Sequence, residues 1–596
     1  MGAGQQPLEE LDSRPGCVWA DGVATFTVWA PNASSAAVDL FRHDLDHDEY
    51  DTVAMEARAG GWWQSLRIEC APGTEYLFRL VGSDNEVVSR MDPRARAVTN
   101  SVGRCVVVDD RFEWSVDDFD PPPVSEWVIY ELHPATFAGD LHAAADRLEL
   151  LKELGINCVE LMPVAEFAGD ISWGYNPALP FAVESTYGGP NALRRFVDRA
   201  HGHGMAVVLD VVYNHLGPSD LDLWRFDGWY EGDGGGIYFY NDWRADTAWG
   251  STRPDYGRDE VRQYLIDNAL MWLQDYRLDG LRLDSTVNIR NAKGEPGPDG
   301  DLADGWRFLA DLTDTVAATS PGKTLIAEDL QANPMITRPT SEGGLGFALQ
   351  WAAGFVHPVR AVLESGDDHE RDLSSVAAAM RGSRPFSRVV YTESHDEVAN
   401  GRTRIPAEID ESDPGSWVAM RRTALGAVLV MTTPDVPMIF QGQEWAEEDW
   451  FDDQRPLAWE RRDQRPGTLQ MWGDLIRFRT GENPACGGLR GDQLSAHHVD
   501  IDSGVLAFLR WGLGGPAEAV LVVCNFRGHR IDGHRVGVPA GGTWCAVFDS
   551  AWSGYHSTGS DTLTTELRSV DEPCDDQPFS LEITLDSYAA AILVRC

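Results

Sequence analysis

Several apolar runs of this sequence end in a carboxylate. Asp210 follows AVVL, Asp284 follows GLRL, Glu328 follows TLIA, and Asp396 lies just beyond RVVYTES. Crowded like charges raise at least one carboxyl pKa while an adjacent guanidinium lowers another, and this separation can divide a general acid from a nucleophile. Two such carboxyl groups about 5 to 5.5 Å apart can cleave a glycosidic bond with retention of configuration.

The segment GLRLDS (280–285) adds an arginine to this set. On a strand, Arg282 and Asp284 share one face, and Leu281 and Leu283 share the other. A guanidinium beside a carboxylate keeps it ionised where water is scarce, which makes Asp284 a candidate nucleophile. The alternative interpretation is an ion pair with a purely structural role.

The chain around these residues alternates between strand-like and helix-like patterns. The predicted strands are 127–133, 158–164, 206–212, 280–285, 324–329, 346–351, 388–394 and 436–440. The predicted helices are 143–154, 190–203, 259–276, 304–318, 416–430 and 467–479. This α/β alternation predicts a (β/α)8 TIM barrel, in which the carboxyl ends of the strands carry the site. A doubly wound open sheet is the alternative, but no G-x-G-x-x-G follows the first strand.

The length of 596 residues requires several domains. Residues 1–112 contain short strand-like runs and are predicted to form an N-terminal β-sandwich. Residues 113–485 hold the barrel, with an inserted lobe at 216–257 that is too long for an ordinary βα loop. Residues 486–596 are strand-like again and are predicted to form a C-terminal β-sandwich domain.

Composition narrows the possible partners and the compartment. Forty-nine basic residues against 94 acidic ones give a net charge of −45, which argues against nucleic-acid and anionic-membrane partners. Nine cysteines without a C-x-x-C pair argue against a disulfide framework and a zinc knuckle. The sequence has neither a secretory leader pattern in its first 30 residues nor 18 consecutive apolar residues, and we expect a soluble, cytoplasmic protein.

The carboxylates could also be metal ligands. Asp210, Asp284, Glu328 and Asp396 offer the oxygen atoms that hard cations prefer. The charge of Arg282 would oppose a divalent ion, and the sequence has no H-x-H or H-E-x-x-H motif. We therefore expect no obligatory metal and no cofactor.

Four segments resemble the signature segments of glycoside hydrolase family 13, the α-amylase superfamily. They are DVVYNH (210–215), GLRLDSTVN (280–288), AEDL (327–330) and ESHDE (393–397), in the order of the family. The N-terminal segments VWAPNA (28–33) and MDPRA (91–95) are similar to the family 48 carbohydrate-binding module of branching and debranching members. The resemblance covers the whole chain and implies the barrel fold and a covalent glycosyl-enzyme intermediate.

The resemblance also implies a role for each matching residue. Asp284 matches the nucleophile, Glu328 the general acid/base and Asp396 the transition-state stabiliser. Arg282 matches the arginine that orients the nucleophile. The residues expected to bind the sugar in subsite −1 are Asp210, His215, His395 and Tyr175, the last through ring stacking from the segment WGYNP (173–177).

Other segments bear on the reaction. SHDEVANGR (394–402), with Arg402 in place of a lysine, and residues 438–459 resemble 1,4-α-glucan branching enzymes. Residues 187–218 resemble maltooligosyltrehalose trehalohydrolases nearly as well. We expect branching, with amylase-like or trehalose-releasing hydrolysis as the alternative and a non-catalytic glucan-binding protein as a remote one. The expected partner is an α-glucan or maltooligosaccharide, and the expected assembly is a monomer or small homo-oligomer.

Overall fold

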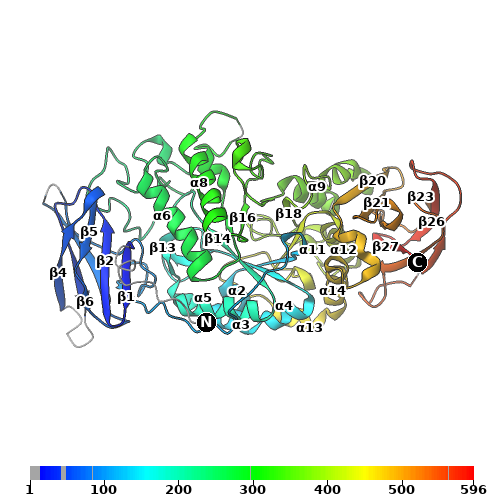
Figure 1. Ribbon diagram of the computed structural model, residues 1–596. Helices are drawn as coiled ribbons and strands as arrows, with labels where there is room; N and C mark the ends of the chain where they lie inside the picture. Colours follow the sequence, from blue (N-terminus) through cyan, green and yellow to red (C-terminus); the bar gives the residue numbers. More distant parts are fainter. Residues whose placement is uncertain (1–13, 42–48, 83–84, 296, 562) are drawn as a thin grey trace.

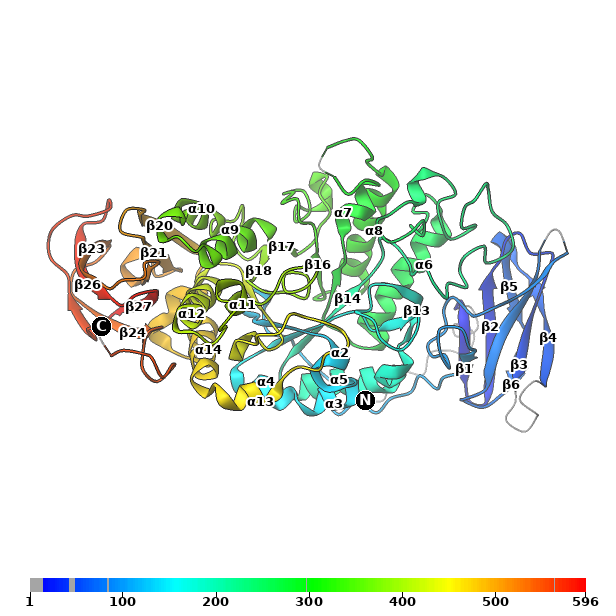
Figure 2. The same cartoon turned by 180° about the vertical axis from the view of Figure 1, so that it is seen from behind.

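The computed structural model describes residues 14–41, 49–82, 85–295, 297–561 and 563–596. Figure 1 shows three regions side by side: N-terminal strands in blue, a central barrel wrapped by helices, and C-terminal strands in orange and red. The view from behind in Figure 2 shows the same order. The division of the chain at residues 112 and 485 stays a prediction.

The centre of the molecule is a closed barrel of eight parallel strands. In barrel order they are β10 (Ile129–Leu132), β11 (Cys158–Leu161), β14 (Ala206–Val211), β15 (Gly280–Leu283), β16 (Thr324–Ala327), β17 (Leu349–Trp351), β18 (Arg388–Val390) and β19 (Val436–Phe440). Pairing of β10 with β19 closes the ring. The predicted TIM barrel is therefore confirmed, and each of the eight predicted strands overlaps an observed one.

Helices surround the barrel between successive strands (Figure 1). They are α2 (Pro134–Ala138), α3 (Leu141–Asp146), α4 (Leu148–Leu154), α5 (Gly189–Gly202), α6 (Asp259–Leu270), α7 (Thr286–Arg290), α8 (Ala303–Thr319), α9 (Ala353–Glu364), α10 (Leu373–Ala379), α11 (Ile405–Ile409), α12 (Trp417–Thr432), α13 (Trp459–Gln464) and α14 (Pro466–Thr480). The helix predicted over 143–154 is two helices, because α3 ends before Arg147 and α4 begins after it.

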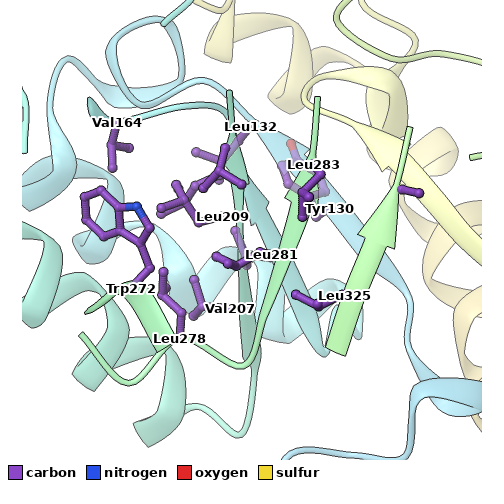
Figure 3. Packing of buried hydrophobic residues seen from close by; sticks show 14 of the residues in the cluster. Tyr130, Leu132, Val164, Val207, Leu209, Trp272, Leu278, Leu281, Leu283 and Leu325 are labelled. Atoms are coloured by element: carbon purple, nitrogen blue, oxygen red, sulfur yellow. The ribbon is translucent and has the colours of Figure 1, made fainter. Parts of the chain in front are cut away.

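Alternating side chains on the barrel strands separate two apolar layers. Outward residues such as Leu209, Leu281 and Leu283 join the large core between strands and helices, as Figure 3 shows. Inward residues, including Ile129 and Val208, form a separate cluster that fills the barrel interior. The period of two along each strand therefore assigns one face to the helices and the other to the interior.

The N-terminal region is one antiparallel sheet of nine strands. They are β1 (Gly16–Ala20), β2 (Val23–Trp29), β3 (Ser35–Phe41), β4 (Tyr50–Ala57), β5 (Trp62–Ser65), β6 (Ile68–Glu69), β7 (Glu75–Val81), β8 (Val87–Arg90) and β9 (Cys105–Val106). The sheet curls over itself, because Phe26 on β2 contacts Tyr76 on β7 with ring centroids 4.8 Å apart although these strands are not neighbours in the sheet. The prediction of a sandwich missed that both layers belong to one continuous sheet.

The segment predicted as an inserted lobe follows β14 and contacts the N-terminal sheet. Asn32 donates from its backbone N and its Nδ2 to Asp227 Oδ2, both at 2.9 Å. Arg90 donates to the carbonyl oxygens of Phe226 and Arg225. These contacts join the lobe to the N-terminal domain.

The C-terminal region has a six-stranded sheet and a two-stranded sheet. The strands are β20 (Gln493–Asp500), β21 (Val505–Trp511), β22 (Val520–Asn525), β23 (Ile531–Val538), β24 (Thr543–Asp549), β25 (Glu566–Arg568), β26 (Phe579–Leu585) and β27 (Ala589–Arg595). β23 and β26 form the smaller sheet, and side chains from both sheets share one apolar core. The C-terminal β domain is therefore confirmed.

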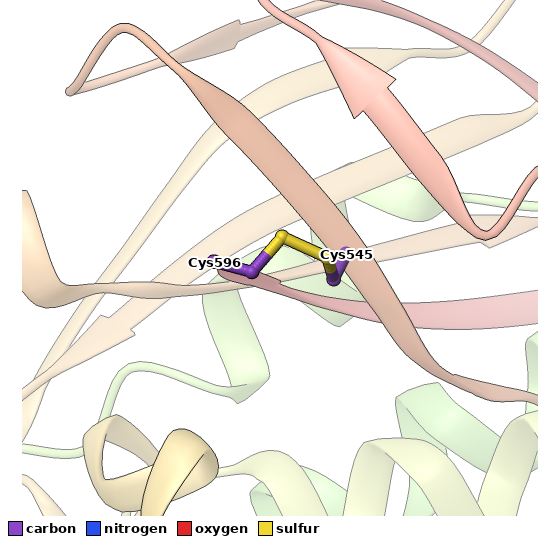
Figure 4. Close-up of a disulfide and its surroundings, with 2 residues drawn as sticks. All are labelled: Cys545 and Cys596. Atoms are coloured by element: carbon purple, nitrogen blue, oxygen red, sulfur yellow. A yellow bond between two sulfur atoms is a disulfide. The ribbon is translucent and has the colours of Figure 1, made fainter.

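One cross-link departs from the cysteine prediction. Cys545 on β24 and Cys596 form a disulfide with a Cα–Cα distance of 5.9 Å (Figure 4). Antiparallel pairing of β24 with β27 brings the two residues together, and an odd, scattered cysteine count cannot reveal that pairing. Cys17, Cys105, Cys158, Cys486, Cys524 and Cys574 are free thiols.

Membrane-spanning segments were also sought among the helices. Within the described ranges, every helix is too short or too polar to cross a lipid bilayer.

Candidate active site

A ring of polar and aromatic residues lies directly above the apolar interior of the barrel. Each of these residues is two positions after an interior residue on its own strand: Glu131 follows Ile129, and Asp210 follows Val208. The same offset gives the inward-facing set Glu131, Glu160, Asp210, Glu328, Trp351 and Tyr391. The strand period therefore places this layer at the carboxyl end of the barrel, where TIM-barrel sites lie.

Arg282 is the central charge of this layer. Its side chain is fully buried, and its Nη1 donates to Asp210 Oδ2 at 2.6 Å and to Asp284 Oδ1 at 3.1 Å. Its Nη2 lies 3.1 Å from Glu328 Oε2. The guanidinium also lies 4.3 Å from the centroid of the Trp351 ring. One cation thus faces three carboxylates from three adjacent strands, which explains why a strand carries both Arg282 and Asp284.

Asp284 is held at both carboxylate oxygens. Arg282 donates to Oδ1, and Asn214 Nδ2 donates to Oδ2 at 2.9 Å. Burial raises the pKa of Asp284 to about 6, against the opposing effect of Arg282. Arg282 lowers this pKa, as expected from the sequence, but desolvation exceeds its attraction and the net shift is upward. The group is still mainly ionised at pH 7.

Glu328 shares the same arginine but has a different environment. The backbone N–H of Ser285 donates to its Oε2 at 2.7 Å. Burial raises the pKa of Glu328 to about 7, and the nearby charges of Asp284 and Asp396 act in the same direction. Near neutral pH, Glu328 can therefore give and take a proton while Asp284 remains a carboxylate.

Tyr175 connects Asp210 to His395. Its hydroxyl donates to Asp210 Oδ2 at 2.5 Å, and its ring stacks on His395 with centroids 4.9 Å apart. Burial raises the pKa of Asp210 to about 6. The structure brings these three predicted sugar-binding residues together.

His395 is buried against Glu131. Its Nδ1 donates to Glu131 Oε1 at 2.5 Å, and its backbone N donates to Oε2 of the same residue at 3.1 Å. Burial opposes protonation of His395, but the charges of Asp396 and Glu131 outweigh it and raise its pKa to about 9. His395 therefore carries a positive charge at neutral pH.

Asp396 is the most exposed of the predicted catalytic residues. Its side chain is 48 % exposed, and its Oδ2 lies 3.6 Å from His395 Nε2. That contact places Asp396 at the same end of the barrel, and its charge raises the pKa of Asp284 and Glu328. An exposed carboxylate is free to accept hydrogen bonds from a ligand.

His215 connects the barrel to the lobe. Its Nδ1 donates to Asn214 Oδ1 at 3.1 Å, and its ring stacks on Trp249, with centroids 4.6 Å apart and planes 14° apart. Burial lowers the pKa of His215 to about 4, so the ring is neutral. Trp249 is 44 % exposed and belongs to the lobe.

Sequence reasoning missed six residues of this site: Glu131, Glu160, Asn214, Trp249, Trp351 and Tyr391. A usable signal existed for Glu131, because it is a carboxylate inside the apolar run WVIYELH, the same kind of signal that selected Arg282. Trp249 and Trp351 carried no such signal, because tryptophans also pack in cores.

Three family models match consecutive parts of the chain. Residues 15–95 match carbohydrate-binding module 48 (isoamylase N-terminal domain), residues 102–225 the alpha-amylase catalytic domain, and residues 496–595 the alpha-amylase C-terminal all-beta domain. The matches follow the order of the three regions in Figure 1.

Named relatives match almost the full length of this chain. The chain is 31 % identical to the 1,4-alpha-glucan branching enzyme GlgB of Kitasatospora aureofaciens, over 99 % of this chain and 78 % of the relative. It is 30 % identical to the enzyme of the same name from Leifsonia xyli, over 95 % and 79 %. The one from Marinobacter nauticus is 29 % identical, over 95 % and 93 %.

Solved structures share the fold. A putative alpha amylase from Salmonella typhimurium superimposes with a TM-score of 0.73 at 23 % identity, covering 98 % of this chain and 99 % of the other. A pullulanase from Anoxybacillus sp. LM18-11, complexed with maltotetraose, gives a TM-score of 0.73 at 20 % identity, covering 99 % and 89 %. The barrel flanked by two β domains is thus common to all three chains.

Proposed function

Because the chain belongs to the α-amylase family, glycoside hydrolase family 13, we propose that it is a retaining 1,4-α-glucan branching enzyme. It cuts an α-1,4 bond of a glucan and transfers the released chain to a C6 hydroxyl through an α-1,6 bond. The main observation behind this proposal is that Arg282 holds Asp284 and Glu328 together at the ends of neighbouring strands, with different pKa values.

The first step needs a nucleophile and an acid. The Asp284 carboxylate attacks the anomeric carbon while protonated Glu328 gives its proton to the glycosidic oxygen, which leaves as the 4-hydroxyl of the remaining chain. The product is a glucosyl ester on Asp284. Hydrogen bonds from Arg282 and Asn214 fix the Asp284 oxygens before the attack, so little orientation is lost at the transition state.

The second step reverses the roles. Ionised Glu328 takes the proton from the 6-hydroxyl of an acceptor chain as that oxygen attacks the anomeric carbon, and the Asp284 carboxylate leaves. The number of glycosidic bonds is unchanged. A pKa of about 7 suits Glu328 to both proton transfers.

The remaining residues bind the sugar at the reacting carbon. Charged His395 and the exposed carboxylate of Asp396 form hydrogen bonds with its hydroxyls, and these bonds strengthen as the ring flattens. Tyr175, stacked on His395, offers an aromatic face to the same sugar. Trp249, stacked on His215 and half open, offers a second aromatic face for the glucan chain.

Support for transfer over hydrolysis comes from the relatives, which carry the name of branching enzymes over most of this chain. The segment SHDEVANGR adds to it. The proposal has three further parts. It includes a cytoplasmic location, which cell fractionation tests, and a monomeric or small homo-oligomeric state, which light scattering tests. It also includes a glycogen-like or starch-like substrate, which a comparison of substrates tests.

The deciding experiment incubates the enzyme with amylose and, in a separate reaction, with maltooligosyltrehalose, and measures the products of each. Branching predicts a blue-shifted iodine complex and new α-1,6 anomeric signals in the proton spectrum, with a constant number of reducing ends. New reducing ends without α-1,6 signals would replace the proposal with an amylase. Release of trehalose from maltooligosyltrehalose would replace it with a trehalohydrolase.

A further inference from the structure

A second cluster of charged residues lies in the C-terminal domain, outside the site described above. His498 and Asp500 are on β20, and His534 is on β23. The two Nε2 atoms lie 2.9 Å apart, and His534 Nε2 lies 4.0 Å from Asp500 Oδ2. Among the residues that the structure describes, these three form the group that could hold a metal ion. All three are partly buried.

The strands place these side chains through local irregularities. The pairing of β20 with β21 shifts register between Ser495 and His498, and the pairing of β23 with β26 shifts between Ile531 and His534. A bulge turns the following side chain out of the regular alternation and is often found at functional sites. Each histidine thus follows an irregularity on its own strand, and the two strands belong to different sheets.

Hydrogen bonding fixes the tautomer of His498. Its Nδ1 lies 2.9 Å from Asp575 Oδ2, which also accepts from the backbone N–H of Gly537 at 2.9 Å. A carboxylate only accepts, so Nδ1 carries the proton and the Nε2 lone pair points toward His534. A histidine that binds a metal through one nitrogen and donates to a carboxylate from the other is a recurrent arrangement.

The side chains next to these residues in sequence, His497 and Arg535, contact groups outside the cluster. Both ring nitrogens of His497 face backbone carbonyls, of Ser495 at 3.1 Å and Gly537 at 2.9 Å. Arg535, next to His534 in sequence, pairs with Glu572 and Glu582. Neither the adjacent histidine nor the adjacent cation therefore occupies the space between His498, His534 and Asp500.

The donor atoms identify the class of ion. Zinc bonds of about 2.0–2.1 Å in tetrahedral geometry place donor atoms about 3.3 Å apart. The observed separations of 2.9 and 4.0 Å lie on either side of that value. Two imidazole nitrogens and one carboxylate oxygen suit Zn²⁺ and its neighbours in the first transition row, whereas Ca²⁺ and Mg²⁺ prefer oxygen ligands.

We propose that His498, His534 and Asp500 bind one zinc-class divalent cation, with Asp575 orienting His498. The ion joins β20, the edge strand of the six-stranded sheet, to β23 of the two-stranded sheet. Its function is to hold the two sheets of the C-terminal domain together. The site is independent of the proposed branching reaction, because it uses none of the residues at the barrel end.

The test uses the full chain after chelation and removal of the chelator, titrated with ZnCl2 and monitored by calorimetry and thermal unfolding. We expect a saturable one-to-one site and a higher unfolding midpoint in zinc, and no comparable response to MgCl2. His534→Gln and Asp500→Asn are each expected to weaken zinc binding at least about tenfold and to abolish the midpoint shift. Branching activity below the unfolding transition is expected to be the same with and without zinc.

Two further variants make the test specific. His529→Gln removes an exposed histidine of the same domain and is expected to bind zinc like the wild type. Asp575→Asn keeps the residue shape and is expected to weaken binding about 10-fold to 100-fold, through the orientation of His498. CoCl2 in place of zinc is expected to give the visible absorption of a tetrahedral site in the wild type but not in His534→Gln. Equal zinc affinity in the wild type, His534→Gln and Asp500→Asn, or no zinc binding by the wild type, would overturn the proposal.

Discussion

Two charged clusters of this molecule differ in the source of the positive charge at their centre. At the barrel end, Asp210, Asp284 and Glu328 surround Arg282, which is fully buried. In the C-terminal domain, two histidine nitrogens and one carboxylate converge, and Arg535, next to His534 in sequence, pairs with Glu572 and Glu582 instead. In the first cluster the cation is the guanidinium of Arg282, which is part of the chain. In the second, we propose, the cation is a metal ion bound from solution.

This difference predicts a different function for each cluster. A guanidinium cannot leave, so the barrel cluster is preorganised at all times and suits catalysis. A bound ion adds stability that depends on its concentration, which suits a cross-link between sheets. Changes at the barrel end should therefore alter rate, and changes in the C-terminal domain should alter stability.

The strongest test of that division is Asp284→Asn. An amide cannot serve as the nucleophile, so we expect kcat to fall on the order of 10⁴-fold with little change in the unfolding midpoint. Branching is measured by the iodine assay. Asp242→Asn, which removes a partly exposed carboxylate paired with Arg244 in the lobe, is the matched control and should keep full activity. Retention of activity by Asp284→Asn would contradict the assigned role.

Arg282→Lys keeps the positive charge but removes the pair of guanidinium nitrogens that face two carboxylates at once. A single ammonium cannot contact Asp284 and Glu328 with the geometry of two guanidinium nitrogens, so kcat should fall by roughly 10²-fold to 10³-fold. Arg194 is equally buried and pairs with Asp110 away from the barrel end. Arg194→Lys therefore controls for the general cost of replacing a buried arginine. Similar rates for the two variants would mean that charge alone matters.

The pH profile of kcat/KM tests the two carboxyl groups separately. Asp284 must be ionised, so activity should fall as the pH drops below its pKa of about 6. Glu328 must be protonated, so activity should also fall as the pH rises above its pKa of about 7. Each limb should change about tenfold per pH unit, as measured with a maltooligosaccharide. A rate that stays constant to pH 9 would exclude Glu328 as the acid.

Trp249→Ala tests the contribution of the lobe to binding. Loss of an exposed ring stacked on His215 should raise KM about tenfold and leave kcat nearly unchanged, because stacking stabilises the bound chain before and during reaction alike. Trp243 is also exposed in the lobe, at 60 %. Trp243→Ala is the control, and an equal rise in KM for both variants would mean that the lobe binds glucan without a defined position.

The smallest expected effect on activity belongs to the disulfide. Cys545→Ser should lower the unfolding midpoint of the C-terminal domain by about 5–10 °C, because the loop closed by the bond gains freedom in the unfolded state. The rate at 25 °C should not change. Reduction of the wild-type protein should give the same midpoint as the variant, followed by calorimetry. A wild-type midpoint unaffected by reduction would show that the bond adds no stability.

The sequence predicted the barrel well because its strands are buried on both faces. Such strands appear as continuous apolar runs, and a charge within one, like Arg282 or Glu328, is conspicuous. The C-terminal cluster gave no comparable signal. His498 and His534 lie on β20 and β23, whose sequences QLSAHHVD and IDGHRVGV contain no continuous apolar run.

The remaining misses have physical causes of the same kind. Register shifts next to His498 and His534 depend on pairing between strands, which local composition does not reveal. The contact between Trp249 and His215 depends on how the lobe folds back over the barrel end. The sign of the pKa shift at Asp284 depends on the balance between burial and Arg282, which requires coordinates.

The contacts of Arg282 reach across β14, β15 and β16. Neighbouring strands in any sheet are about 4.8 Å apart, a spacing set by backbone hydrogen bonds rather than by side chains. The spacing of the barrel strands therefore sets the distance between the two reacting carboxyl groups, Asp284 and Glu328. The surrounding loops do not set this distance. Exchange of the lobe or the flanking domains could therefore change which acceptor chain binds, while the distance between the two carboxyl groups that break the bond stays the same.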